Sequence, residues 1–465
     1  MAFCILYHFA LNKKYFNFLL RFFFLFFLIV TVCGCGKKDK QIPTFSGEIA
    51  NLLYQKCSNC HHQGGPAPFS LVSYEEIKQR DKLIALVVSN GYMPPWPADT
   101  AYSRFADEKV LNKSEINLIK EWVDNNSPIG NEKEIPEPPD YSTGSLLGKP
   151  DLVIRMQKAF PIKGNNRDKF LLMKLPYEIQ KDTIIQTIEF VPCQTQIVHH
   201  VNAQLLSYEI GSRKNVFSGE LYVDVDDFPN MLSAYEKMQL ANDDGTYPLM
   251  SQSVCNYLPG VLPFSYPEGI GGIRMKKKGA LFLKDIHYGP SNKNMIDSSY
   301  FNIFFAKTPI KRPTLEMQLG TWGISIIEPE LKIPANEVKT FKTQITLTGK
   351  ISLLTVNPHM HLLGKKFLAY AVTKQLDTIP LIRINNWDFR WQYFYTYKKP
   401  VIIPEGSTIY VFGTFDNTIN NPLNPNHPPI EVSEREGSMR TSDEMFQFIL
   451  TYLPYQLGDE NIALE

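Results

Sequence analysis

Seven of the nine histidines in this chain lie in a few short segments, and any fold must account for that grouping. Imidazole is the commonest metal ligand in proteins, and histidines placed for other reasons seldom cluster in this way. The pattern predicts a haem and two further metal centres, built from segments far apart in the sequence. The seven residues are His61 beside His62, the pair His199 and His200, His287 alone, and His359 with His361.

The length and charge of the chain narrow the possibilities further. At 465 residues, the chain is long enough for about three domains of ordinary size. A formal net charge of +1 with 20% charged residues provides no broad basic field. Nucleic acid is therefore not an expected partner.

The N-terminal region has the pattern of an export signal. Lys13, Lys14 and Arg21 precede an apolar run from Phe22 to Val32, which is 11 residues long and too short for a membrane-spanning helix of about 20 residues. We therefore expect residues 1–35 to be a secretory signal peptide.

The segment that follows, Val32-Cys33-Gly34-Cys35, resembles a bacterial lipobox, in which the cysteine is acylated after cleavage. Cys35 fits this role better than Cys33, because a bulky valine precedes Cys33. The resemblance implies a lipid-anchored protein of the bacterial cell envelope, on the periplasmic or outer-surface side. A plain signal peptide or an uncleaved anchor stays open as the alternative.

The remaining cysteines divide into one motif and one unassigned pair. Cys57 and Cys60 belong to the motif described next, which leaves Cys193 and Cys255. In an exported protein these two could form a disulfide or remain separate thiols. The sequence leaves both alternatives open.

Cys57, Cys60 and His61 form a CxxCH sequence, the attachment pattern of covalent haem c. Two thiols form thioethers with the porphyrin, and the adjacent imidazole becomes an axial ligand of the iron. A zinc knuckle would need a second cysteine or histidine pair nearby, and only His62 is present. We therefore expect a small all-α cytochrome c domain at residues 36–130.

Helical patterns on both sides of the motif agree with that expectation. Apolar residues at helical spacing occur just before Cys57 and again from Ile116 to Val123, where Asn112 and Glu115 could form a capping box. The intervening loop around Met93 resembles the distal-ligand loop of small class I cytochromes c. Met93 is thus the candidate sixth ligand, with core packing as the alternative, and residues 131–150 are expected to form a Pro/Glu-rich linker.

Beyond residue 151 the pattern changes to short β-rich runs separated by Pro, Gly and Asn turns. Clear examples are Val338–Leu347 and Thr408–Phe415. We expect two all-β sandwich domains here, at residues 151–330 and 331–465.

The histidine spacings in this β-rich region differ in what they imply. His359 and His361 are two residues apart, so in an extended strand both side chains leave the same face and can hold one ion. Pro358 suggests a sheet edge or the start of a strand. His199 and His200 are consecutive, so shared coordination requires a local twist or different ring nitrogens.

An ordered series of motifs makes residues 151–465 similar to the copper type II, ascorbate-dependent monooxygenases, the family of peptidylglycine α-hydroxylating and dopamine β-monooxygenases. The resemblance implies two jelly-roll-like β-sandwich domains, each carrying one copper ion. The motifs are Val198-His199-His200, Leu258-Pro259-Gly260, Tyr266-Pro267-Glu268-Gly269, His287-Tyr288, His359-Met360-His361-Leu362-Leu363-Gly364-Lys365 and Thr441-Ser442-Asp443-Glu444-Met445.

The same resemblance implies the ligands of two copper ions. It assigns an electron-accepting copper to the first sandwich and, to the second, a copper where dioxygen reacts and a carbon–hydrogen bond is hydroxylated. Met439 is a lesser candidate for the sulfur ligand, and His427 is expected to be a loop residue. The implied ligands are His199, His200 and His287 in the first sandwich, and His359, His361 and Met445 in the second.

Departures from the family pattern limit the expected substrate. Where the peptide-hydroxylating members hold a peptide carboxylate with Arg, Asn and Tyr, this chain has Asn357, Gln447 and Ile449. Phe446 replaces a family cysteine, so the family's disulfide is absent there. A glycine-extended peptide is therefore not the expected substrate.

Together these patterns predict an exported copper-dependent monooxygenase that hydroxylates a small organic substrate with O2. Its own haem would supply the electrons, fed by an ascorbate-like reductant or a redox protein. The alternative function is a non-catalytic electron-transfer or copper-binding lipoprotein. A zinc hydrolase is a weaker option, because zinc has no redox function that a tethered haem would serve.

Overall fold

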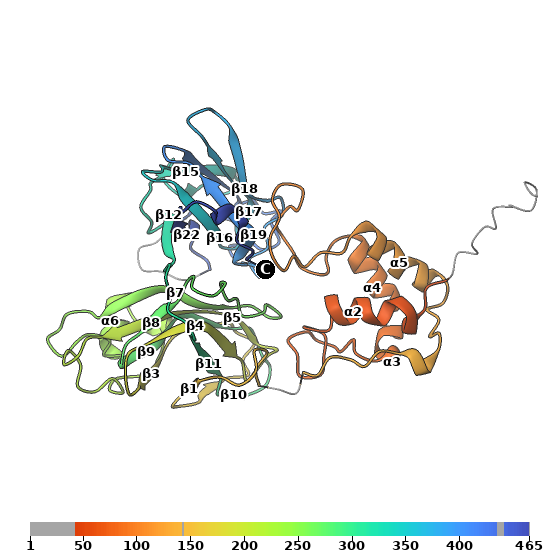
Figure 1. The fold of residues 1–465 in the computed structure, drawn as a ribbon, viewed down its shortest axis with the longest axis horizontal. Helices are drawn as coiled ribbons and strands as arrows, with labels where there is room; N and C mark the ends of the chain where they lie inside the picture. Colours follow the sequence, from red (N-terminus) through yellow and green to blue (C-terminus); the bar gives the residue numbers. More distant parts are fainter. Residues whose placement is uncertain (1–41, 142–143, 435–440, 465) are drawn as a thin grey trace, which may run out of the picture.

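The computed structural model describes residues 42–141, 144–434 and 441–464. The expected signal peptide, Cys35 and Met439 lie outside these described residues. Figure 1 shows three bodies, which are a helical unit at one end and two layered β units that lie beside each other.

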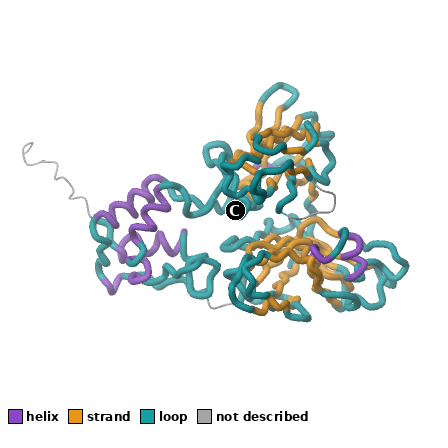
Figure 2. The backbone as a smooth tube through the Cα atoms, turned by 180° about the vertical axis from the view of Figure 1, so that it is seen from behind, coloured by secondary structure: helices purple, strands orange, loops and turns teal. Residues whose placement is uncertain are grey.

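The helical unit occupies the first part of the described chain, and Figure 2 shows helices gathered at that end. A core of large apolar side chains, among them the fully buried Trp122, holds these helices together. The predicted Asn112–Glu115 capping box is confirmed at the start of α5. The elements are η1 (Phe45–Ile49), α2 (Ala50–Lys56), α3 (Tyr74–Lys78), α4 (Asp81–Ser89), α5 (Lys113–Asp124) and η2 (Glu132–Glu134).

The first β unit pairs a five-stranded sheet, in the order β6-β3-β9-β5-β7, with a four-stranded sheet, in the order β1-β11-β4-β8. One apolar cluster fills the space between them. Its elements are β1 (Leu152–Arg155), β2 (Phe160–Ile162), β3 (Lys169–Glu178), β4 (Thr183–Val191), β5 (Val198–Tyr208), β6 (Tyr222–Asp224), η3 (Val225–Asp227), α6 (Met231–Lys237), β7 (Leu249–Tyr257), β8 (Ile273–Met275), β9 (Lys278–Tyr288), β10 (Met295–Asp297) and β11 (Tyr300–Phe305).

The second β unit has the same plan, with sheets in the orders β13-β15-β20-β17-β18 and β12-β22-β16-β19. Its elements are β12 (Leu315–Gly320), β13 (Ile327–Glu328), β14 (Lys332–Ile333), β15 (Val338–Thr346), β16 (Ile351–Met360), β17 (Gly364–Val372), β18 (Thr378–Ile384), β19 (Tyr395–Ile403), β20 (Thr408–Asp416), β21 (Val432–Ser433), β22 (Phe446–Pro454) and η4 (Asp459–Asn461).

The strand predictions are confirmed at both quoted segments, which become β15 and β20. Burial along β20 alternates at every residue, as expected for a strand with one face on the core. The sandwich architecture follows from two such sheets covering each other's apolar faces.

The chain crosses between the two sandwiches earlier than residue 330. Strand β12 already pairs with β22, so the crossing lies between Phe305 and Leu315. The pairing partner of β12 is the last strand of the chain. The sequence around β12 does not indicate which sandwich the strand joins, because its pairing partner is remote in the sequence.

A segment of the helical unit, residues 95–106, leaves its helices and packs on the second sandwich, where Figure 1 shows it reaching the blue sheet. Ala98 and Phe105 form isolated bridges to Ile384 and Tyr397 and belong to the core cluster of that sandwich. The Asp99 carboxylate accepts hydrogen bonds from this sandwich as well. The helical unit is therefore fixed to the second sandwich by apolar and polar contacts.

The two sandwiches also contact each other directly. Leu258 from the first enters the core cluster of the second. The Tyr266 hydroxyl lies 2.9 Å from the Thr355 hydroxyl, and Arg312 pairs with the Asp459 carboxylate. The motifs around Leu258 and Tyr266 therefore lie at this interface.

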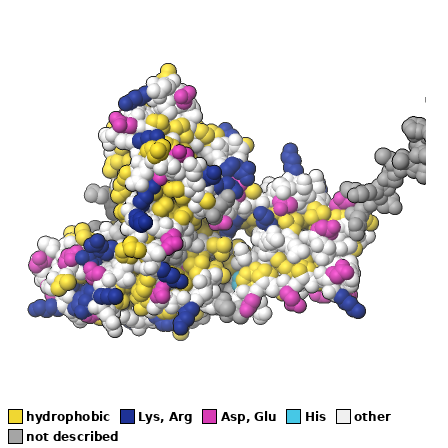
Figure 3. All heavy atoms as spheres, in the orientation of Figure 1, with side chains coloured by type: hydrophobic (Ala, Val, Ile, Leu, Met, Phe, Trp, Pro, Cys, Tyr) yellow, Lys and Arg dark blue, Asp and Glu magenta, His cyan; other side chains and the backbone are white. Residues whose placement is uncertain are grey.

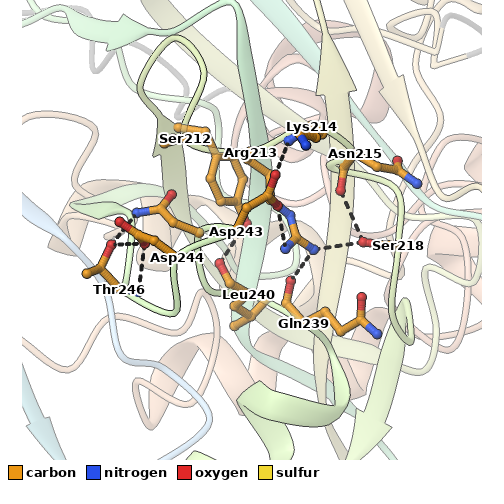
Figure 4. A network of polar contacts seen from close by, with 12 residues as sticks. Ser212, Arg213, Lys214, Asn215, Ser218, Gln239, Leu240, Asp243, Asp244 and Thr246 are labelled. Atoms are coloured by element: carbon orange, nitrogen blue, oxygen red, sulfur yellow. Dashed lines mark hydrogen bonds and ion pairs between the residues drawn. The ribbon is translucent and has the colours of Figure 1, made fainter.

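Polar contacts organise the outer loops of the first sandwich, and Figure 4 shows one such network around Arg213. Its guanidinium donates to the Ser218 hydroxyl at 2.7 Å and to the Gln239 carbonyl at 3.0 Å, and it pairs with Asp243 at 3.4 Å. These bonds join the loop that follows β5 to the turn that follows α6.

The surface agrees with the near-zero net charge. On the face drawn in Figure 3, acidic and basic side chains are mixed over all three units. Within the described ranges, every helix is too short or too polar to span a membrane.

The Arg312–Asp459 pair provides a test of the interface between the sandwiches. Burial disfavours the ionised Asp459 carboxylate, but hydrogen bonds from Arg312, Ser352 and the Gln456 N–H outweigh this and lower its pKa from 3.8 to about 2. A carboxyl whose folded pKa is depressed stabilises the fold above its ordinary pKa, and this stabilisation is lost as the pH falls toward 2.

We expect Arg312→Met to lower the free energy of unfolding by about 2–3 kcal/mol at pH 7, measured by urea titration. The difference from the unsubstituted protein should shrink below about pH 4. Glu330→Gln, which removes an exposed ion pair with Lys332, should cost less than about 0.5 kcal/mol. An Arg312 variant as stable as the unsubstituted protein at pH 7 would contradict the account.

Candidate metal centres

The first histidine cluster forms where β5 and β9 pair. The register shifts between Val198 and His200, so a β-bulge lies at His199. A bulge re-aims a side chain, which removes the difficulty that consecutive strand residues face opposite ways. The His287 ring centroid consequently lies 4.9 Å from that of His199 and 5.0 Å from that of His200.

Surrounding residues shape this cluster. A Cβ atom added at Gly289 would collide with the His199 ring, so the glycine leaves room for the imidazole. Phe170 stacks on the His287 ring at 4.1 Å with an interplanar angle of 7°. The three rings are therefore held by packing on the strand faces.

Carboxylates hold one nitrogen on two of these rings. Asp168 lies 2.7 Å from His287 Nε2, and Asp285 lies 2.6 Å from His200 Nε2. Metal-binding histidines commonly use their second nitrogen in this way, which fixes the ring and leaves the other nitrogen for the ion.

The free nitrogens suit a metal. His287 Nδ1 is buried and has no hydrogen-bond partner within the described chain. One ligand atom from each of Asp168, His199 and His287 lies within 4.8 Å of the others. Burial, followed by the neighbouring histidine charges, lowers the pKa of His199 to about 4, so its lone pair is available at neutral pH.

The second cluster lies at the end of β16. The ring centroids of His359 and His361 are 5.1 Å apart. Burial, followed by the His361 charge, lowers the pKa of His359 to about 3. His361 Nδ1 is 2.8 Å from the Asp443 carbonyl, which again leaves one nitrogen of the ring free.

Met445 reaches this cluster through strand pairing. Met360 pairs with Phe446 and His359 with Gln447, so the next position in the register places Met445 opposite His361. Met445 is buried. The structure thus brings the segment that precedes Met445 beside His361, whose N–H donates to Glu444 and whose ring contacts the Asp443 carbonyl.

Pro358 lies inside β16, so of the two expected settings the start of a strand is wrong, whereas Pro358 is locally at an edge because only one side of it is paired. It pairs with Phe448 of β22, but on the other side the ladder with β19 ends at Val356. A proline has no N–H to donate. Pro358 lacks a strand partner on the side that faces away from β22.

Glu444 organises the second cluster through the backbone. Its carboxylate accepts the N–H groups of His361 at 2.9 Å, Leu363 at 2.7 Å and Met445 at 3.2 Å. Burial raises the pKa of the Glu444 carboxyl to about 8, although the three hydrogen bonds act to lower it. One side chain therefore ties the histidine turn to the methionine strand.

Phe389 lies between the two clusters. Its ring centroid is 6.2 Å from that of His200 and 5.7 Å from that of His361, with both pairs edge-on. One aromatic ring therefore contacts both clusters, and one cluster belongs to each sandwich.

The CxxCH residues follow α2. His61 Nδ1 lies 3.1 Å from the Phe69 carbonyl, which leaves Nε2 free. Cys57 and Cys60 are unpaired cysteines, and burial raises the pKa of the Cys57 thiol to about 12. Two free thiols and an oriented imidazole fit the requirements of covalent haem attachment.

Other predicted residues have more ordinary surroundings. Met93 is half-buried in the loop after α4, and its N–H donates to the Val87 carbonyl at 3.1 Å. His62 stacks on Tyr141 at 4.0 Å. His427 lies in an exposed loop.

Cys193 and Cys255 are both free, the first exposed and the second buried. Of the two alternatives that the sequence left open, the structure has separate thiols at these positions.

The sequence reasoning missed the residues that support the ligands, namely Asp168, Asp285, Glu444 and Phe389. Two of them had a signal, because Asp285 lies two residues before His287 and Glu444 directly precedes Met445. Nothing in the sequence connects Asp168 or Phe389 with the histidines.

Comparison with known families agrees with the second cluster. Residues 317–426 match the family model of the copper type II ascorbate-dependent monooxygenase, C-terminal domain. The matched segment contains His359 and His361, and it ends before Met445. This part of the second sandwich is therefore similar to that copper-dependent domain.

No curated protein matches the chain. Among solved structures, one of the Sulfolobus turreted icosahedral virus is 11% identical, covering 65% of this chain and 90% of the other, with a TM-score of 0.19. A structure of allantoicase is 7% identical, covering 56% and 83%, with a TM-score of 0.15.

The role of Glu444 leads to a prediction. Glu444→Ala leaves three buried N–H groups without an acceptor, so we expect it to release metal from the second cluster only. Elemental analysis of copper-treated protein should then show one ion per chain, whereas Glu444→Gln, which keeps an acceptor oxygen, should retain more of the second ion. Full copper content in Glu444→Ala would show that the carboxylate does not support the site.

Proposed function

We propose that this chain is a copper-dependent monooxygenase that hydroxylates a C–H bond of a small organic substrate with O2, using electrons supplied through its own haem c. The observation that carries the proposal is the pair of histidine clusters that contact Phe389, one of them inside a segment that matches a copper monooxygenase domain. Ligand atoms of His199 and His287 lie within 4.8 Å of each other, close enough to share one ion.

His199, His200 and His287 would hold one copper ion, and His359, His361 and Met445 would hold the other. Imidazoles support both oxidation states of copper, and a thioether favours the cuprous state. Copper supplies one-electron redox chemistry with dioxygen. The protein's own contribution is to lower the pKa of four of these imidazoles by burial and to fix three of the rings, those of His200, His287 and His361, through Asp285, Asp168 and the Asp443 carbonyl.

Cys57, Cys60 and His61 would hold the haem, with Met93 as the candidate sixth ligand. A haem c supplies electrons singly, which suits two copper ions that each store one electron. The chain's part in this is to orient His61 through the Phe69 carbonyl and to hold the motif against the first sandwich, where Thr195 donates to the Gly64 carbonyl at 2.7 Å.

The side chains at the peptide-binding positions of the family support a substrate other than a peptide. Asn357 is buried and donates to the Tyr393 carbonyl at 3.0 Å. Gln447 is also buried and donates to the Thr321 carbonyl at 2.9 Å. Both amides are already engaged within the sandwich, so neither is available to hold a substrate carboxylate.

We further propose that the protein is exported and anchored in the bacterial envelope by a lipid on Cys35. The N-terminal sequence supports this proposal, and covalent haem attachment suits a location outside the cytoplasm. A lipoprotein-specific label on the expressed protein that disappears in Cys35→Ala would test the anchor.

Substitution of the second cluster tests the activity. Copper-loaded, reduced protein should consume oxygen and form a hydroxylated product from at least one member of a panel of small amines and apolar compounds. His359→Ala and Met445→Ala should each lower product formation at least about a hundredfold, while haem content stays unchanged. Complete inertness with both coppers bound would favour the alternative, a non-catalytic electron carrier.

Substitution of the haem motif tests how separate the sites are. Cys57→Ser should abolish covalent haem, measured by haem staining after denaturation, and leave copper content unchanged, because the histidine clusters belong to the sandwiches. Loss of copper together with haem would show that the helical unit is required to form the copper sites.

A further inference from the structure

A lysine of the helical unit lies where that unit meets both sandwiches. The ammonium group of Lys109 donates to the carbonyl of Gly260, in the loop of the first sandwich that follows β7. The same ammonium lies 5.7 Å from the centre of the Tyr393 ring of the second sandwich, within the range of a cation–π interaction. Lys109 therefore ties the helical unit to both sandwiches at one point.

Cys60 of the CxxCH motif lies beside the same loop. A Cβ atom added at Gly260 would overlap Cys60 Sγ, and the same position is 3.8 Å from Lys109 Nζ. Cys60 Sγ is also 4.0 Å from the Pro259 carbonyl. In the proposed haem, this sulfur would form one of the two thioether links to the porphyrin. The Lys109 ammonium is therefore a neighbour of the atom that would carry one edge of the haem.

The charge of Lys109 is only partly screened. Within the described chain no carboxylate forms an ion pair with this lysine, whereas Arg104 of the same loop pairs with Glu108 at 2.7 Å. Burial lowers the pKa of the Lys109 ammonium, so water hydrates this group incompletely. The Asp107 carboxylate favours the charged ammonium, but it is exposed and its effect is weakened by water. The positive charge thus acts through a poorly hydrated region, where Coulomb interactions are stronger than in water.

We propose that Lys109 raises the reduction potential of the haem, and that the Gly260 carbonyl holds the ammonium in place for this role. Ferric haem carries one more positive charge than ferrous haem, so a cation beside the porphyrin destabilises the ferric state more. Reduction adds one electron to the iron, and no bond forms or breaks. The proposal rests on the proposed function, because it requires the haem on Cys57, Cys60 and His61.

The contact with Gly260 links the haem potential to the docking of the helical unit. In an undocked unit the Lys109 side chain could extend into water, where its charge would be screened. In the docked unit the carbonyl keeps the ammonium beside Cys60. Lys109 therefore favours the ferrous haem, the form that holds an electron for copper, when the helical unit is docked on the first sandwich.

The test compares the haem potential of full-length, haem-containing variants. A redox titration without oxygen follows the ferrous absorbance against the applied potential. We expect Lys109→Gln and Lys109→Met to lower the ferrous-to-ferric ratio at a fixed potential at least about tenfold, which is about 59 mV for one electron. Lys109→Arg, which keeps the charge, should change the ratio less than about threefold.

Two comparisons separate charge from contact. The amide of Lys109→Gln can still donate to the Gly260 carbonyl, so a lowered potential in Lys109→Met with an unchanged potential in Lys109→Gln would reduce Lys109 to a structural contact and overturn the proposal. Lys113→Gln removes the same charge from an exposed position at the start of α5, and it should change the ratio less than about threefold. Equal shifts in Lys109→Gln and Lys113→Gln would also overturn the proposal.

Haem content and the ferric absorption spectrum are recorded for every variant. A shift confined to variants with an altered axial-ligand band would show that the iron coordination had changed instead, and it would overturn the proposal. Absence of covalent haem from the unsubstituted protein would end this proposal and the haem-fed function together. Shifts as expected in a copper-loaded protein that hydroxylates nothing would end the proposed function alone. An unchanged potential in a haem-loaded Lys109→Gln would overturn the role of Lys109 alone.

Discussion

The candidate metal centres depend on one kind of hydrogen bond. It engages one nitrogen of a histidine ring and leaves the other nitrogen free. His287 is held by Asp168, His200 by Asp285 and His361 by the Asp443 carbonyl. Burial lowers the pKa of the other imidazoles and of two of these three, His287 and His361, and the polar partners fix the three rings in place. Without such partners, the imidazole rings could rotate and form hydrogen bonds with other nearby groups. With them, each sandwich holds its histidine cluster in the space beside Phe389.

The three units are joined around that space. The 95–106 segment enters the core of the second sandwich, Leu258 crosses from the first sandwich to the second, and Cys60 packs against Gly260. Phe389 separates the histidine clusters. The helical unit is therefore docked at the junction of the two sandwiches, although the sequence suggested an independent domain on a Pro-rich linker. Tyr141 of that linker itself stacks on His62.

Much of the fold was predictable from local patterns. Alternating burial in Thr408–Asp416 follows the period of a strand, and the capping box at Asn112 follows from two residues three apart. The histidine groups were found because the residue type itself is rare and chemically specific. What could not be predicted depends on pairing over long distances. The bulge at His199, the early crossing into β12 and the reach of Glu444 to Leu363 are set by partners remote in sequence.

The central claim is that these clusters bind two copper ions with different ligands, and X-ray absorption spectroscopy at the copper edge tests it most directly. The account predicts two coppers per chain in reduced protein, with a sulfur scatterer that disappears in Met445→Ala while the imidazole signal remains. A spectrum without sulfur, or one unchanged by that substitution, would contradict the account.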